Sequence, residues 1–341
     1  MSADHVMARR LTLLLSTPRI APGLFTRDAW TAIANAAHVL TRDEDETQLI
    51  AIQESGIAAA HLGEQHPAAL ARLLVDRAAD GEVVWIGSAD GDAGLTDALA
   101  AEVSRRHDPP EIEVLVGSYD VPGARLLDLV AVMDRLRSPG GCPWDAEQTH
   151  ESLVPHLIEE AHELVEAIES GDRTHMAEEL GDVLLQVAFH ARMAQEHPNS
   201  PFGIDDVASG IVDKLVRRHP HVFAEVAAED GAQGDASTAE DVAAGWERIK
   251  AEEKPHRSSP LDGIPEGLPA LARANKAAAR LHQAGLEDVM AEAARGDDVG
   301  PRLLALVLEA RKAGVDPEAA LRTVVRDLEA VARIDAKPPA C

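Results

Sequence analysis

The sequence is poor in aromatic and basic residues. Only 3% of its 341 residues are aromatic, and 32 Lys and Arg stand against 59 Asp and Glu, which gives a formal charge of −27. Proteins that bind nucleic-acid polymers need clustered cations against the phosphate backbone, so this balance argues against such a partner. A small phosphorylated substrate is still compatible, because a bound metal ion can neutralise its charge.

Cysteines and long apolar runs are also scarce. Two cysteines, Cys142 and Cys341, are too few for a disulfide framework, which favours a cytoplasmic protein. The longest apolar runs, such as residues 303–308, are too short to span a bilayer. The first residues have neither the basic start nor the apolar stretch of a secretory signal, so we expect no membrane association.

The residues that are abundant favour helices. Apolar residues make up 45% of the chain, and the scarcity of aromatic ones leaves mainly Ala, Leu and Val to form the core, a composition that suits helix packing. Residues 8–120 nevertheless alternate strand-like segments (11–15, 83–86 and 112–116) with helix-like segments (29–38, 68–79 and 96–107), which predicts a mostly parallel sheet. From Gly123 onward only helices are expected, at 125–137, 152–169, 172–196, 205–218, 239–253, 271–284, 302–313 and 317–331. A loop is expected at 225–238, between the helices at 205–218 and 239–253.

We therefore predict an α+β multidomain protein. A small α/β domain occupies residues 1–120, an all-α helical bundle occupies 122–255, and further helices occupy 268–341. The linker before the last region is rich in proline.

Two acidic patches on consecutive predicted helices are the most informative feature. Glu160 and Glu163 are three residues apart, as are Glu179 and Asp182, so each pair shares one helical face. Carboxylates gathered in this way repel one another unless a cation lies between them, and ligands that are all oxygen favour Mg²⁺ or Mn²⁺ over Zn²⁺. Glu159 lies about 100° around the helix from Glu160, which suits a supporting or water-orienting role. The alternative is a solvated acidic face, but two such patches together favour a metal site.

Apolar neighbours should place these acids on or beside a buried stripe. These neighbours are Leu153, Leu157, Ile158, Leu164, Ile168, Leu180, Val183, Leu184 and Val187. Histidines at positions 156, 162 and 190 lie on the same helices. They lack the paired His and Cys spacing of a zinc site, so a zinc centre is not expected.

Four motifs together resemble the MazG family of nucleoside triphosphate pyrophosphohydrolases. The first is residues 135–150, with the sequence Arg-Leu-Arg-Ser-Pro-Gly-Gly-Cys-Pro-Trp-Asp-Ala-Glu-Gln-Thr-His. The two acidic patches together are the second motif, and the third and fourth are Asp-Lys-Leu-Val-Arg-Arg-His-Pro-His-Val-Phe at 213–223 and Trp-Glu-Arg-Ile-Lys at 246–250. The resemblance spans residues 122–285. It implies an all-α catalytic domain, a homodimer, and Mg²⁺-dependent cleavage of NTPs or dNTPs at the α–β phosphoanhydride bond to give a nucleoside monophosphate and pyrophosphate, with Mn²⁺ as a possible substitute.

Geometry and resemblance together assign Glu160, Glu163, Glu179 and Asp182 as metal ligands, with Glu159 also in the catalytic group. Substrate contacts are expected from a set of cations and aromatic residues, namely Lys214, Arg217, Arg218, Trp246, Lys250 and Trp144. The three cations near position 218 could instead complement the dipole at a helix C-terminus. Trp246 could be a core residue, and Trp144 could anchor its loop by packing.

Two regions depart from the family pattern. Residues 268–276 resemble the start of a second catalytic repeat, yet no acidic pair follows between 285 and 335, where Asp-Asp-Val-Gly-Pro stands at 297–301. We interpret 268–341 as a degenerate repeat kept for packing or dimerisation. Residues 1–120 resemble a reduced tetrapyrrole-methylase-like domain, and no methyltransferase activity is inferred.

The leading hypothesis is an enzyme that removes non-standard or damaged nucleotides. A narrower alternative is a pyrophosphatase for dUTP or phosphoribosyl-ATP. An alternative from another class is a non-catalytic regulatory protein whose acidic helices form a partner surface.

Overall fold

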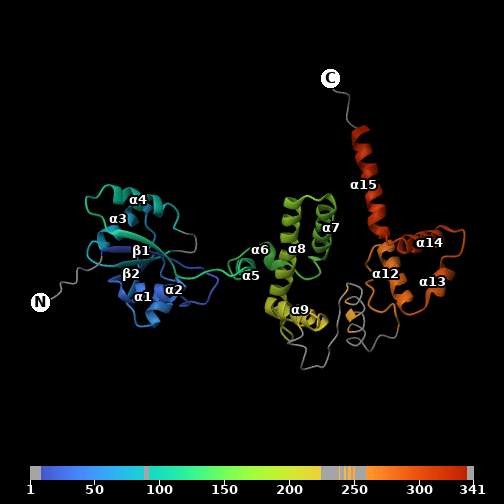
Figure 1. Cartoon of the computed structure of the whole chain (residues 1–341), viewed down its shortest axis with the longest axis horizontal. Coiled ribbons are helices and arrows are strands. Elements are labelled where there is room, and N and C mark those ends of the chain that lie inside the picture. Colours follow the sequence, from blue (N-terminus) through green and yellow to red (C-terminus); the bar gives the residue numbers. More distant parts are fainter. Residues whose placement is uncertain are drawn as a thin grey trace, which may run out of the picture. The chain divides into compact units, whose positions relative to one another are not determined.

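The structure is a computed structural model that describes residues 9–87, 92–223 and 259–335, together with residues 238, 242, 245, 246 and 249 (Figure 1). Its internal contacts divide the chain into two compact units, residues 1–211 and 212–341, and the boundary falls within helix α9. None of the helices in the described ranges is long and apolar enough to cross a membrane.

The first unit begins with a five-stranded parallel sheet. Its strands are β1 (Arg10–Leu15), β2 (His38–Thr41), β3 (Ala59–His61), β4 (Val83–Ile86) and β5 (Glu111–Val116), in the order β3-β2-β4-β1-β5. Every pair is parallel, and Leu11 of β1 lies opposite Val83 on one side and Ile112 on the other. The prediction of a parallel α/β sheet is confirmed, although β2 and β3 were not predicted.

Helices cover both faces of this sheet (Figure 1). Helices α3 (Pro67–Ala78) and α4 (Leu95–Ser104) pack with Leu11, Leu40 and Trp85 on one face. Helices α1 (Arg27–Asn35) and α2 (Thr47–Glu54) pack with Leu14 and Ile86 on the other face. The predicted helix at 29–38 is too long, because α1 ends at Asn35 and the chain turns extended into β2.

The second part of this unit is helical, as predicted. It contains α5 (Leu126–Arg137), α6 (Pro143–Glu147), α7 (Val154–Ser170), α8 (Arg173–Ala194) and the first half of α9 (Ile204–Arg218). Helix α7 ends at Gly171, whose φ of 75° is left-handed and therefore favours glycine. The Asp172 side chain then accepts hydrogen bonds from the backbone N–H groups of Thr174 and His175 and caps α8. This short connection makes α7 and α8 a helical hairpin.

Helix α5 holds α8 through apolar and ionic contacts. Met133 packs with Leu153, Phe189 and Met193 in one buried cluster. The guanidinium group of Arg137 donates two hydrogen bonds to the carboxylate of Glu196, at 3.0 and 2.8 Å. These contacts fix the C-terminal half of α8.

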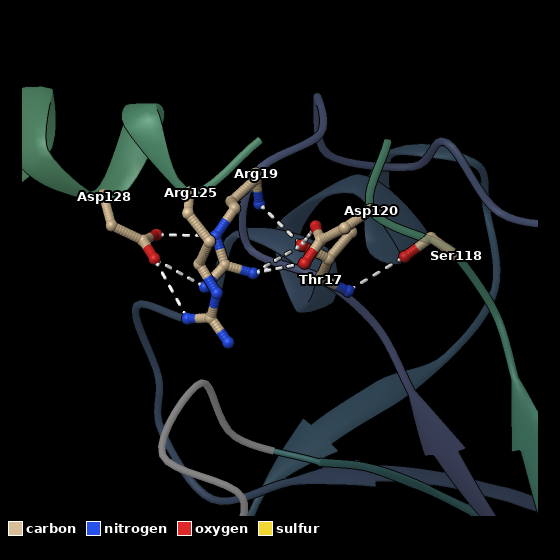
Figure 2. Close-up of polar contacts among 6 residues, drawn as sticks. All are labelled: Thr17, Arg19, Ser118, Asp120, Arg125 and Asp128. Carbon is tan, nitrogen blue, oxygen red and sulfur yellow. Dashed lines mark hydrogen bonds and ion pairs between the residues drawn. The ribbon is translucent and has the colours of Figure 1, made fainter. Parts of the chain in front are cut away.

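The start of α5 is joined to the sheet by a polar network (Figure 2). Arg19, which follows β1, donates two hydrogen bonds of 2.7 Å to the carboxylate of Asp128 on α5. Arg19 also pairs with Asp120 at 2.6 Å, and the Thr17 hydroxyl bonds that same carboxylate. The backbone N–H of Thr17 donates to the Ser118 hydroxyl at 2.9 Å. The network ties the segments that follow β1 and β5 to the helix that supports α8.

The described part of the second unit is also helical. It includes the end of α9, then α12 (Ala270–Gln283), α13 (Glu287–Ala293), α14 (Val299–Lys312) and α15 (Pro317–Asp335). Gly285 and Gly314, which follow the ends of α12 and α14, have left-handed φ angles of 68° and 71°. The predicted helices at 271–284, 302–313 and 317–331 are confirmed within a few residues, whereas α13 was not predicted. The predicted loop at 225–238 and helix at 239–253 lie largely outside the described residues.

Candidate metal centre

The α7–α8 hairpin brings the two acidic patches together. Glu160 of α7 and Glu179 and Asp182 of α8 each offer one carboxylate oxygen, and these oxygens all lie within 4.8 Å of one another. Glu179 is only 6% exposed, and the other two are half-buried. Residues 19 and 22 positions apart in the sequence therefore converge because the helices pair in antiparallel fashion across a short turn.

One oxygen of this cluster is left without a partner. Oε1 of Glu179 lies 2.9 Å from Nε2 of His175, with which it forms an ion pair. Its second oxygen, Oε2, is buried and has no hydrogen-bond partner among the described residues. A buried, unpaired carboxylate oxygen is unfavourable unless a cation or a donor meets it. With oxygen the only ligand type in the cluster, these residues fit a hard cation such as Mg²⁺ or Mn²⁺.

The charges in the cluster also oppose one another. The pKa of Glu160 is raised, first by burial of its carboxyl group and then by the charge of Asp182 and the other acids of the two patches. Raised carboxyl pKa values are the expected result of gathering like charges without a counter-ion. A divalent cation would reverse this effect.

Two other acids of the predicted site lie at its edge. Glu163 is exposed and is not one of the three residues whose oxygens converge, although its charge contributes to the raised pKa of Glu160. Glu159 is exposed, and its nearest ionic contact is His156 Nδ1 at 3.9 Å. The assignments of Glu163 as a ligand and Glu159 as a supporting residue stay predictions.

Most of the apolar residues beside the acids are exposed in the single chain, so the expectation that they form a buried stripe is wrong for them. Leu153 is buried, but Leu180 is 51% exposed. The exposed set also includes Leu157, Ile158, Ile168, Leu184 and Val187. Apolar side chains at helical spacing were expected to pack inside the chain, whereas here they lie on the surface of the hairpin.

The predicted phosphate-binding cations lie in the second unit. Lys214 and Arg217 of α9 are exposed, and Arg218 is half-buried. The Arg218 guanidinium lies 5.8 Å from the centre of the Trp246 ring, and His219 meets the same ring edge-on at 5.2 Å. Two predicted substrate residues, Arg218 and Trp246, are thus in contact. Lys250 lies outside the described residues.

Trp144 lies on α6 and is 54% exposed. Its ring meets His156 edge-on at 6.4 Å. The short helix is held at its C-terminal end, because the Arg137 guanidinium donates to the backbone carbonyl oxygens of Asp145 and Gln148. An exposed aromatic ring on a helix held in this way is compatible with the predicted contact to a base, which stays a prediction.

Several polar contacts and buried polar residues along α8 were not predicted from the sequence. His175 precedes Glu179 by four residues, which was a signal that could have been read as an i,i+4 pair. Gln186 is buried, and His190 lies against His150. No local signal marks the last pair, because its members are 40 residues apart in the sequence.

The acidic hairpin lies in a segment that matches a known protein family. A family model described as the MazG nucleotide pyrophosphohydrolase domain matches residues 148–223. The nucleoside triphosphate pyrophosphohydrolase/pyrophosphatase MazG of Thermotoga maritima is 40% identical over 219 residues, which cover 58% of this chain and 80% of that protein. The chain belongs to the MazG family.

Other relatives extend the similarity. A 26.1 kDa protein in the blaB 3′ region of Streptomyces cacaoi is 54% identical over 238 residues, covering 70% of this chain and 93% of that protein. The nucleoside triphosphate pyrophosphohydrolase of Mycolicibacterium smegmatis is 50% identical over 167 residues, and the chain spans 48% of its length. The MazG model match includes both acidic patches and the three cations of α9, but neither Trp144 nor Trp246.

Proposed function

We propose that this MazG-family chain is a Mg²⁺-dependent nucleoside triphosphate pyrophosphohydrolase, converting an NTP or dNTP and water into a nucleoside monophosphate and pyrophosphate. The observation that carries the proposal is the convergence of three carboxylate oxygens within 4.8 Å, one of them from a buried glutamate whose second oxygen is unpaired. The relatives named as pyrophosphohydrolases in Thermotoga maritima and Mycolicibacterium smegmatis support the reaction type.

The residues of the hairpin have separate tasks in this reaction. Glu160, Glu179 and Asp182 would hold the metal ion, and we keep Glu163 as a fourth ligand supplied from the edge of the cluster. When bound, the ion supplies a nucleophilic water and neutralises phosphate charge. The His175 imidazole, 2.9 Å from Glu179, fixes the orientation of that carboxylate. Glu159 lies beside the cluster and is suited to orient a water molecule.

The cations and aromatic residues complete the proposed site. Lys214, Arg217 and Arg218 would bind phosphate oxygens that face away from the metal ion. Trp246 and Lys250 would bind the base and a phosphate, and Trp144 would form a wall against the base. The contact between Arg218 and Trp246 supports a shared role for these two.

We also propose that the active form is a homodimer. The exposed leucine, isoleucine and valine side chains of α7 and α8 lie beside the metal ligands, and a second copy of the chain would remove them from water. Light scattering of the wild type should give twice the chain mass. A Leu184→Glu variant, which places a charge on this apolar surface, should give the mass of one chain.

The other regions have supporting roles in this proposal. The catalytic domain would be residues 122–255, and residues 268–341 would be a degenerate repeat that contributes packing or dimer contacts. Nothing in the described part of residues 259–335 reproduces the group of three carboxylates seen in the hairpin. The α/β domain of residues 1–120 would support α5 through the Arg19 network.

Alanine variants of the three converging acids test the proposed function. Glu160→Ala, Glu179→Ala and Asp182→Ala should each abolish hydrolysis while the circular dichroism spectrum and melting temperature stay close to those of the wild type. Near-wild-type turnover in any two of them would refute the assignment. A panel of standard nucleotides, damaged nucleotides and dUTP would decide between a role in removing non-standard nucleotides and the narrower dUTP pyrophosphatase.

A further inference from the structure

The polar face of α8 continues beyond the metal ligands. Gln186 is four residues after Asp182, and His190 is four residues after Gln186. At about 100° per residue, positions 179, 182, 186 and 190 all fall within about 80° of one another around the helix. The same face that carries two of the converging carboxylates therefore carries an amide and an imidazole further along.

Both of these side chains have buried atoms without partners. Gln186 is 5% exposed, and its Oε1 has no hydrogen-bond partner among the described residues. The Nε2 atom of His190 is also buried and has no hydrogen-bond partner among the described residues. Together with Glu179 Oε2, this makes three unpartnered polar atoms along one helical face. Buried polar groups are normally paired, so a row of unpaired ones points to a polar ligand.

The imidazole of His190 is fixed by a second histidine. Its Nδ1 lies 2.7 Å from Nδ1 of His150, and the two rings are parallel within 6°. One of these nitrogens must donate and the other accept, so the tautomer of His190 is linked to that of His150. Burial, and then the charge of His150, lower the pKa of His190, which favours its neutral form. In the neutral ring, Nε2 has the hydrogen-bonding role opposite to that of Nδ1, so it can serve a ligand as a single donor or a single acceptor.

The spacing along the helix matches the length of a nucleotide. With a rise of about 1.5 Å per residue, Gln186 lies about 6 Å and His190 about 12 Å beyond Asp182 along the axis. A triphosphate bound at the carboxylates and extended along α8 would place its sugar near the first residue and its base near the second.

We propose that Gln186 and the His150–His190 pair recognise the nucleoside of the substrate. Gln186 Oε1 accepts a hydrogen bond from a sugar hydroxyl, and His190 Nε2 bonds the edge of the base. The inference rests on the proposed function, because it assumes that a nucleoside triphosphate binds at the acidic cluster. The competing explanation is that these residues serve packing alone.

The hydroxyl contact can be tested with three substrates that differ only in the sugar. We would measure kcat/KM for ATP, dATP and 2′,3′-dideoxy-ATP with the wild type, Gln186→Met and, as a control, His107→Phe, which alters an exposed histidine of the α/β domain. For the wild type and the control, kcat/KM should fall about two- to tenfold when the contacted hydroxyl is removed from the substrate, which is the effect of one neutral hydrogen bond. Gln186→Met, similar in shape but without the acceptor, should show no such loss.

Several results would overturn the inference while leaving the proposed function intact. One is a wild type with the same kcat/KM for all three nucleotides. Another is a Gln186→Met variant whose kcat/KM is lower than that of the wild type by the same factor for all three. For the base contact, His190→Phe should change the order of preference among the four dNTPs, whereas a uniform change would overturn that part. Failure of the wild type to hydrolyse any nucleotide would overturn the proposed function itself, and the inference with it.

Discussion

Replacing Glu179 by glutamine should affect the stability of the metal-free protein and of the metal-bound protein in different ways. The substitution keeps the shape of a side chain that is 6% exposed and removes its charge from a cluster of three acids. Without metal, the loss of repulsion should leave the melting temperature unchanged or raise it. With Mg²⁺ at about 100 times its dissociation constant, the wild type should gain about 2.7 kcal/mol.

That gain has a measurable size. For cooperative units of about 150–250 residues, 1 kcal/mol shifts the melting temperature by roughly 2–4 °C, so the wild type should shift by about 5–10 °C. Glu179→Gln should shift by much less, because a neutral amide is a weaker ligand for Mg²⁺ than a carboxylate. Thermal melts with increasing Mg²⁺ would measure both effects, with Glu178→Gln, an exposed neighbour, as the matched control. A full Mg²⁺-dependent shift in Glu179→Gln would refute the assignment of this residue.

Three further predictions concern other parts of the molecule. Alanine at Lys214 or Arg218 should lower kcat/KM roughly ten- to a hundredfold with little change in melting temperature, and the reverse pattern would mean that they only stabilise the helix end. Alanine at Gly141 should lower the free energy of unfolding by about 1–3 kcal/mol in a denaturant titration, because its Cβ would overlap backbone carbonyl oxygens at the end of α5; an unchanged midpoint would contradict this. Hydrogen bonding to Arg137 lowers the pKa of Glu196 below its ordinary value of 4.5. The contribution of this pair to the stability of the folded protein is therefore present above pH 4.5 and is lost as pH falls through the lowered pKa. Glu196→Gln should therefore be less stable than the wild type near pH 7, and a difference that did not shrink in acid would contradict the pairing.

The elements that the sequence predicts well are those with local signals. Helices α7 and α8 follow from apolar periodicity, and Gly171 and Asp172 mark the turn between them. Strand β4 was predicted with its observed bounds. Strands β2 and β3 were missed because neither is a continuous run of large apolar residues like the four residues of β4, and they exist through pairing with other strands of the sheet.

The candidate site could be predicted in part for the same reason. The spacing of Glu179 and Asp182, together with a hairpin, is enough to bring them to Glu160. The position of Glu163 outside the group of three depends on how the two helices are rotated against each other, which periodicity alone does not determine. The contact between His150 and His190 depends on a loop folding back over α8, a tertiary event without a sequence pattern.

The products formed from a nucleoside triphosphate show which phosphoanhydride bond the protein cleaves. Purified protein would be incubated with each NTP and dNTP, with and without Mg²⁺, and the nucleotide and phosphate products would be separated by chromatography. We expect nucleoside monophosphate and pyrophosphate in equal amounts, formed only when Mg²⁺ is present. Nucleoside diphosphate with inorganic phosphate, or no hydrolysis of any nucleotide, would contradict it.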